Sequence, residues 1–298
     1  MGVSLLPPDY FLDKGFLAKL SSAPKAHTKA IQKELAETEF LRCADDPVYW
    51  LDTRRHPAFT YAYTLDPRPL YQCKRCVAQA HPLAEASIPE FRVESHLAKW
   101  HNVGCAEGES PTLHYNLIPR KRPFTVKPYM PPMIHWWRQS QFFAVEKSRD
   151  MIATWLMSAL IAWDVLFHSA TQWVVQSKEA PTTLEIVRDR CFYLWQNQPK
   201  FLRDVHPAKF IMGSTRSGEM KVPSLRSEIL GFPQGPDKIR YLHPAGVFLD
   251  EAAFQDKAKD AVGAIQPAIK GGGKLNMISS ANPGYFQLIC EDRLDDAI

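Results

Sequence analysis

Short apolar runs that end in polar residues recur along this chain, and the sharpest is Gly246-Val-Phe-Leu-Asp250-Glu251. A continuous apolar run of this length is typical of a buried strand in a parallel sheet. Ligands of open α/β sheets bind just outside the carboxyl ends of such strands. One carboxylate here has the chemistry to hold Mg²⁺, and the next to orient a water for attack on a phosphate. Taken alone, the same residues also describe a strand that ends in a solvated acidic turn.

A second pattern places a strand directly before a strongly apolar helix. The run Gln141–Val145 predicts the strand, and the helix predicted over Thr154–His168 is apolar nearly all round, as buried helices are. The intervening loop would lie at the amino end of the helix, where backbone N–H groups and the helix dipole favour phosphate. The alternative is a strand–helix joint that binds no ligand.

Two further strands are predicted, Thr171–Ser177 and Lys274–Ser279. The second is followed by Ser280-Ala-Asn-Pro-Gly284, and short polar donors at a strand end have the chemistry of a sensor for a terminal phosphate. These residue types also favour a plain turn. Beside the other strand ends, we favour the sensor.

The predicted loop departs from the usual phosphate-binding pattern G-x-x-x-x-G-K-[ST]. With Thr154 aligned on the last position, Lys147 stands for the first Gly, Ile152 for the second and Ala153 for the Lys. Ile152 is the harder departure, because a β-branched residue disfavours the positive φ that Gly accepts freely. The loop is therefore expected to be wider than usual or partly collapsed without nucleotide.

The positively charged residues of this loop lie near its beginning. Lys147 and Arg149 would supply the positive charge for phosphate, whereas Asp150 would repel phosphate and is expected to point away or to pair with one of them. The nucleotide contacts are assigned to Lys147, Ser148, Arg149, Asp150, Met151, Ile152, Ala153 and Thr154.

Composition narrows the class of protein. The 298 residues are 45% apolar, enough for one large or two ordinary domains, and a formal net charge of +4 does not by itself indicate nucleic acid. The amino terminus lacks a signal-peptide pattern, and the apolar run Met151–Trp163 is shorter than the about 20 residues that cross a bilayer. We expect a soluble, cytoplasmic protein without disulfides. The 24 prolines predict long irregular connections, with loops over much of 203–244.

Two cysteines and two histidines are spaced as in a structural zinc site. Cys73-x₂-Cys76 precedes His96-x₄-His101, with positions 77 to 95 between the pairs, which fits tetrahedral Cys₂His₂ coordination. A module of this size needs a metal because its hydrophobic content is small. Cys105 in place of His101 stays open, as does the alternative of chance thiols and surface histidines. A DNA-contacting role and a structural or protein-contacting role are both compatible with the module.

In their order and spacing, these motifs resemble the ATPase domain of a tailed-bacteriophage large terminase. Glu146–Leu156 resembles the deviant Walker A of that family, Val247–Phe254 its Walker B, and Ile278–Gly284 its coupling motif. Upstream, Cys43–Trp50 and Thr64–Pro67 resemble the family's lead-in.

The resemblance implies ATP hydrolysis coupled to movement of double-stranded DNA into a procapsid. Mg²⁺ would be held by Thr154 and Asp250, and Glu251 would orient the attacking water. Lys147 and Arg149 would neutralise the charge that develops, with Arg149 as a finger in cis unless a neighbouring subunit supplies one. The coupling residues implied are Ser279, Ser280 and Asn282.

The resemblance also implies partners and a setting. The partners are double-stranded DNA, a portal protein and a small terminase subunit, and the working form is a homo-oligomeric ring in the cytoplasm of an infected bacterial host, with no membrane. Two departures stand out. The family's adenine-side Pro-Tyr-Gln is Pro128-Tyr129-Met130 here, for which Gln139 is the substitute candidate, and the C-terminal nuclease is absent, so nuclease activity is not expected.

The predicted fold is a three-layer α/β P-loop NTPase (RecA-like) domain with a mostly parallel sheet and a small inserted zinc-finger-like module. Residues 1–70 form a helical arm and lead-in, 71–118 the module, and 119–298 the ATPase domain. Two rival functions remain. One is another DNA-dependent P-loop ATPase, such as a helicase-like translocase; the other is a non-hydrolysing, zinc-bearing interaction protein.

Overall fold

The computed structural model describes residues 25–52, 60–73, 115–149, 151–213, 218–235, 239 and 242–292. The chain divides into two compact units, Tyr63–Pro123 and the remainder, Met1–Ala62 with Phe124–Ile298. The smaller unit encloses the expected module 71–118 and contains an antiparallel ribbon of β1 (Tyr63–Cys73) and β2 (Tyr115–Pro123).

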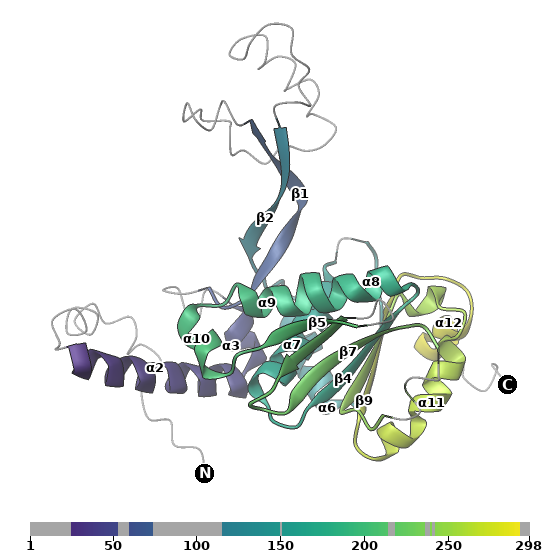
Figure 1. The fold of residues 1–298 in the computed structure, drawn as a ribbon. Helices are drawn as coiled ribbons and strands as arrows, with labels where there is room; N and C mark the ends of the chain where they lie inside the picture. Colours follow the sequence, from purple (N-terminus) through teal and green to yellow (C-terminus); the bar gives the residue numbers. More distant parts are fainter. Residues whose placement is uncertain are drawn as a thin grey trace, which may run out of the picture. The chain divides into compact units, whose positions relative to one another are not determined.

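The larger unit is built on a seven-stranded sheet in the order β3-β9-β8-β4-β7-β6-β5 (Figure 1). The first five strands in that order run parallel, and β6 and β5 are added antiparallel at one edge. The predicted α/β fold with a mostly parallel sheet is therefore confirmed. The strands are β3 (Phe142–Glu146), β4 (Gln172–Ser177), β5 (Lys209–Met212), β6 (Gly218–Val222), β7 (Ser227–Pro233), β8 (Gly246–Asp250) and β9 (Lys274–Ser279).

The four strands expected from apolar runs are present as β3, β4, β8 and β9, and the apolar helix is present as α7 (Ala153–Phe167). The expectation of loops over much of 203–244 is wrong, because β5, β6 and β7 lie there. The prolines in this stretch misled the prediction. Pro223 stands in the turn between β6 and β7, and Pro233 is the last residue of β7, two places where a strand does not need a proline N–H.

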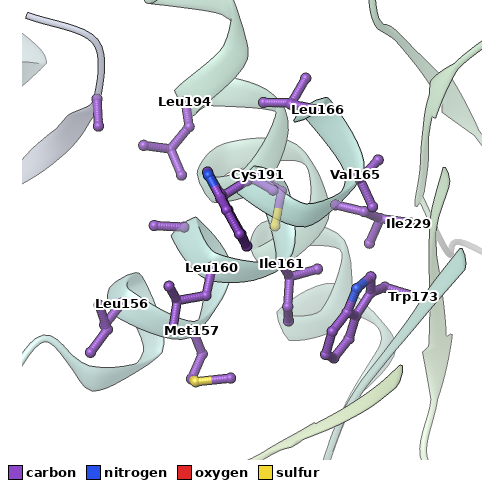
Figure 2. Packing of buried hydrophobic residues seen from close by; sticks show 14 of the residues in the cluster. Leu156, Met157, Leu160, Ile161, Val165, Leu166, Trp173, Cys191, Leu194 and Ile229 are labelled. Atoms are coloured by element: carbon purple, nitrogen blue, oxygen red, sulfur yellow. The ribbon is translucent and has the colours of Figure 1, made fainter. Parts of the chain in front are cut away.

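One face of the sheet packs against α7, whose side chains are buried nearly all round. A long helical segment, in which the π-helical stretch η3 interrupts α-helix, packs against α7 and also directly against the sheet at β6 and β7. Figure 2 shows Leu156, Leu160 and Ile161 of α7 in the same cluster as Cys191 of η3 and Trp173 of β4. The helices whose buried side chains join this cluster are α2 (Lys25–Asp45), α3 (Pro47–Leu51), α6 (Met130–Gln139), η3 (Ile186–Phe192), α9 (Tyr193–Gln196) and α10 (Lys200–Val205), and α8 (Ala180–Glu185) leads into η3.

The other face of the sheet is covered by the last helices of the chain, drawn in yellow-green to yellow in Figure 1. α11 (Ala258–Lys270) buries its apolar stripe against β8 and β9, the 3₁₀ turn η4 (Ala252–Phe254) follows β8, and α12 (Tyr285–Cys290) packs against β3 and η4. The domain thus has helix, sheet and helix layers. Within the described residues, no helix has the length and apolar character needed to cross a bilayer.

Candidate phosphate-binding site

Three parallel strand ends bring the predicted chemistry to one edge of the sheet. β3, β9 and β8 are neighbours, with Glu146 opposite Ser279 and Asp250 opposite Ile278. Because these strands run in the same direction, the segments that follow them leave the sheet at the same edge. The loop after β3, the Asp250-Glu251 turn and the segment after β9 therefore surround one site.

Thr154 and Asp250 are in direct contact at this edge. The Thr154 hydroxyl, in the first turn of α7, donates to Asp250 Oδ1 at 3.0 Å. Asp250 is 4% exposed, and burial raises the pKa of its carboxyl to about 6, while the charge of Arg190 and the Thr154 hydrogen bond oppose that rise. A hydroxyl and a buried carboxylate offer the hard oxygen ligands that Mg²⁺ prefers, so the residues present fit this ion.

Glu251 faces the loop from the end of β8. Lys147 Nζ lies 3.3 Å from Glu251 Oε1, and the Ser279 hydroxyl donates to Glu251 Oε2 at 3.5 Å. The Lys147 side chain is 11% exposed and the Glu251 side chain 35%. Three residues from three different strand ends thus form one charged cluster.

The loop is anchored at both ends. The Lys147 N–H donates to the Ser279 carbonyl at 3.0 Å, and the Tyr129 hydroxyl donates to the Met151 carbonyl at 2.6 Å. Ile152, which stands where the usual pattern has its second Gly, has φ 45° and ψ 25°, in the left-handed region. The backbone therefore keeps the conformation that Gly normally provides, although the residue is β-branched.

The other residues predicted to contact the nucleotide differ in where they lie and in how exposed they are. Ser148 and Arg149 are exposed on the loop, Ala153 is buried at the start of α7, and Asp150 lies outside the described residues. Gln139 does not join them. It ends α6 just before the amino end of β3, at the opposite edge of the sheet from the loop.

The segment after β9 makes one more contact with the acidic turn. Asn282 donates from its side-chain amide to the Ala253 carbonyl at 3.0 Å, which ties the predicted coupling segment to η4. Ser279 is fully buried and contacts Glu251, whereas Ser280 is partly exposed. Two of the three predicted coupling residues therefore touch the turn that carries Glu251 or the residues just after it.

Arg190 is a site residue that the sequence did not single out. Its charge is among the influences that lower the pKa of Asp250, and its guanidinium carbon lies 5.9 Å from the Trp155 ring centroid. Nη2 donates to Glu185 at 3.1 Å, but Nη1 is buried and has no acceptor within the described part of the chain. Arg190 lies on η3, and π-helical turns often mark functional positions. An arginine within a largely buried helical stretch was the only available signal.

The expected zinc ligands fall almost entirely outside the structure described. Cys73 is the last residue of β1, while Cys76, His96, His101 and Cys105 lie outside the described residues. Among the residues that are described, no three His, Cys, Asp or Glu side chains form a group that could hold a metal ion. The zinc prediction accordingly stays a prediction.

The fold and this edge define an α/β domain with a candidate phosphate-binding site at the carboxyl ends of its parallel strands. No family model matches the sequence, and no curated protein does. Among solved structures, the fold is similar to the HK97 bacteriophage large terminase, with TM-score 0.45 and 18% identity, over 59% of this chain and 38% of that one.

Two further structures are similar. A large terminase from a thermophilic bacteriophage has TM-score 0.41 and 16% identity, over 58% of this chain and 44% of that one. The large terminase ATPase domain of Thermus phage P74-26 has TM-score 0.41 and 14% identity, over 55% of this chain and 68% of that one. The resemblance to large terminases that the motifs indicate is thus found in structure as a partial likeness at low identity, and the chain spans less than half of each of the first two proteins.

Proposed function

We propose that this chain is an ATP hydrolase that binds the nucleotide phosphates at the carboxyl edge of β3, β9 and β8. The observation that carries the proposal is the contact between Thr154 and Asp250, with Glu251 at the next position and Lys147 beside it. This edge of the sheet therefore brings together the groups that phosphoryl transfer needs: a hydroxyl, a buried carboxylate, a second carboxylate and a cation.

Phosphate binding falls to the loop and to the start of α7. The first turn of this 15-residue helix has backbone N–H groups without intrahelical partners, and they carry the positive end of the helix dipole. Lys147 adds a positive charge, and Arg149 is exposed where it can reach a phosphate or a neighbouring subunit. Arg190, whose Nη1 has no acceptor among the described residues, is a further source of positive charge within the same chain.

Thr154 and Asp250 would hold Mg²⁺, which supplies positive charge to the β- and γ-phosphate oxygens when bound. Asp250 must lose its proton to serve as a ligand, and burial makes that loss harder while the nearby cations Arg190 and Lys147 make it easier. The carboxylate is therefore best suited to the ion above about pH 6.

Glu251 would orient the attacking water. In the structure its carboxylate is paired with Lys147. Without phosphate, each of these two side chains is therefore held by the other. Recruitment of Lys147 by phosphate frees Glu251 to accept a hydrogen bond from water. Ser279 and Asn282, which contact Glu251 and the Ala253 carbonyl, would pass the change to the rest of the domain, with Ser280 beside them.

We further propose that hydrolysis drives translocation of double-stranded DNA in a viral packaging motor. This step rests on the order of the sequence motifs. If it is right, we expect a portal and a small terminase subunit as partners, a ring as the working assembly, and the host cytoplasm as the location. The zinc module stays an expectation of the same kind. A non-hydrolysing interaction protein would explain Ala153 and Ile152 equally well by sequence. The left-handed backbone at Ile152 favours a working loop over a decayed one.

The test is ATP titration with and without Mg²⁺, together with turnover assays, on the wild type, Glu251→Gln and Lys147→Ala. We expect Mg²⁺-dependent binding by the wild type and by Glu251→Gln, with turnover reduced about 100-fold or more in Glu251→Gln because the water is no longer oriented. Lys147→Ala should weaken binding roughly tenfold, since it removes a charge-assisted phosphate contact.

Lys270→Ala is the matched control, because Lys270 is exposed at the far end of α11. Undiminished hydrolysis by Glu251→Gln would refute the role of Glu251. Absence of nucleotide binding in the wild type, with and without Mg²⁺, would refute the hydrolase and favour the interaction protein.

A further inference from the structure

Gln255 lies buried directly behind the acidic turn. It follows η4 and is 5% exposed, so its polar side chain has been taken almost entirely out of water. Burial of a carboxamide is costly unless its hydrogen-bonding groups are used. Its contacts therefore indicate why a glutamine occupies this position.

The Gln255 amide nitrogen spans two strand ends. Nε2 donates to the Asp250 carbonyl at 2.7 Å and to the backbone carbonyl of Gln176 at 3.5 Å. The ladder between β4 and β8 ends at the pair Gln176 and Leu249, so these two carbonyls lie where the strands stop pairing with each other. The side chain takes over the hydrogen bonding that the ladder no longer provides.

The turn held in this way is strained. Glu251 has φ 51° and ψ 44°, a left-handed conformation that a residue with a Cβ rarely adopts. Such a conformation persists when surrounding contacts fix it. The Phe254 N–H donates to the Glu251 carbonyl at 2.9 Å, and Gln255 closes the same turn from the Asp250 side. The direction of the Glu251 carboxylate depends on this backbone.

Gln176 extends the arrangement to a second segment. Its Nε2 donates to the carbonyls of Pro233 at 3.2 Å and Gly235 at 2.8 Å, in the connection that leaves β7. Both glutamines thus use both amide hydrogens on backbone carbonyls. The Oε1 atoms of both are buried without a donor in the described part of the chain, so each carboxamide is held by its nitrogen.

We propose that Gln255 is a positioning residue for Glu251, an inference that rests on the proposed hydrolase function. Its amide fixes the Asp250 carbonyl and thereby the left-handed turn that aims the Glu251 carboxylate at the site. Gln176 joins the same strand ends to the Pro233–Gly235 connection, so displacement of that connection is transmitted to the turn. Glutamate cannot replace either glutamine, because its carboxylate would face two carbonyl oxygens without a donor.

The experiment compares Gln255→Met with Gln176→Met and Gln198→Met in the full chain. Methionine keeps the length and approximate volume but removes the donors, and Gln198 is a control of equal burial, at 5% exposure. We expect kcat of Gln255→Met to fall roughly 10- to 100-fold with KM for ATP changed less than about threefold, because only the reacting geometry is lost. Gln176→Met should fall less, and Gln198→Met should match the wild type.

Amide hydrogen exchange over 252–254 supplies a readout that does not need turnover. Faster exchange there in Gln255→Met than in Gln198→Met is expected, since the turn opens when the Asp250 carbonyl is released. Equal kcat in these two variants, or equal exchange, would overturn the positioning role. Absence of hydrolysis in the wild type would instead refute the hydrolase, and the exchange comparison would still decide whether Gln255 holds the turn.

Discussion

Ile152 shows how one residue can depart from a motif while its backbone does not. A left-handed backbone costs a residue with a Cβ about 1–2 kcal/mol, and a β-branched side chain lies at the high end. The side chain of Ile152 packs against the main core cluster, and the loop is bonded on either side at Lys147 and Met151. These contacts hold the strained residue in place, so its backbone has the left-handed conformation that a Gly would provide in the usual pattern.

Asp250 makes stability depend on pH. Its carboxyl has a pKa of about 6 in the folded chain against an ordinary value of 3.8, so the folded state keeps a proton that the unfolded state has lost between these two values. Stability should therefore fall as pH rises from about 4 to about 6. Asp250→Asn removes this ionisation and should be more stable than the wild type at pH 7 by roughly 3 kcal/mol, because one pKa unit is 1.36 kcal/mol.

Urea unfolding of the wild type and Asp250→Asn across pH 4 to 8 measures this difference. Asp260→Asn, on the exposed side of α11, is the control and should follow the wild type. A gap between Asp250→Asn and the wild type that does not grow from pH 4 to pH 7 would contradict a raised pKa for Asp250.

Among the strands, β8 depends on a close approach that its sequence alone does not reveal. Gly246 begins β8, and a Cβ built there would lie 2.4 Å from the ring of Trp173 on the neighbouring strand β4. Trp173 is fully buried, its indole N–H donates to Asp164 at 2.7 Å, and it stacks on Trp137 at 6.2 Å between centroids. The ring is fixed on several sides and visible among the packed side chains of Figure 2.

Gly246→Ala should therefore destabilise the domain by roughly 2–3 kcal/mol, as overpacking of a rigid core does. Gly263→Ala is the matched control, because a Cβ at Gly263 meets nothing within 4 Å and the residue lies inside α11. That change should stabilise by roughly 0.5–1 kcal/mol. Thermal unfolding of both variants tests the pair, and equal melting temperatures would contradict the crowding at Trp173.

For the whole molecule, the open question is the metal of the inserted module. We expect purified protein to contain one zinc per chain, because the Cys73, Cys76, His96 and His101 spacing fits a structural site. Metal analysis should show that Cys76→Ser loses most of the zinc, while Cys290→Ser, which alters an exposed free thiol of the larger unit, retains it. Protein purified without stoichiometric zinc would make the module a metal-free insertion.

Much of the candidate site could be read from the chain because it is local. The apolar runs of β3, β8 and β9 and the residues just after each strand follow one another in sequence, and the parallel direction of buried strands places all three ends at one edge. The β5–β6–β7 extension was missed since its prolines look like loop residues until pairing partners are known. Gln139 was assigned to the nucleotide without knowledge that α6 ends at the other edge.

The sequence by itself determined which strands end in reactive residues and their order along the chain. It also determined the buried helix after the first of these strands and the residue types at each strand end. Only the tertiary structure decided that Arg190 acts on the Asp250 carboxyl, that Gln255 donates to the Asp250 carbonyl and that Lys147 pairs with Glu251. The physical reason is the separation along the chain between the residues that interact. Periodicity and turn chemistry act between residues close in the chain, whereas the contacts of a buried guanidinium or of a bridging carboxamide depend on groups that only folding brings beside it.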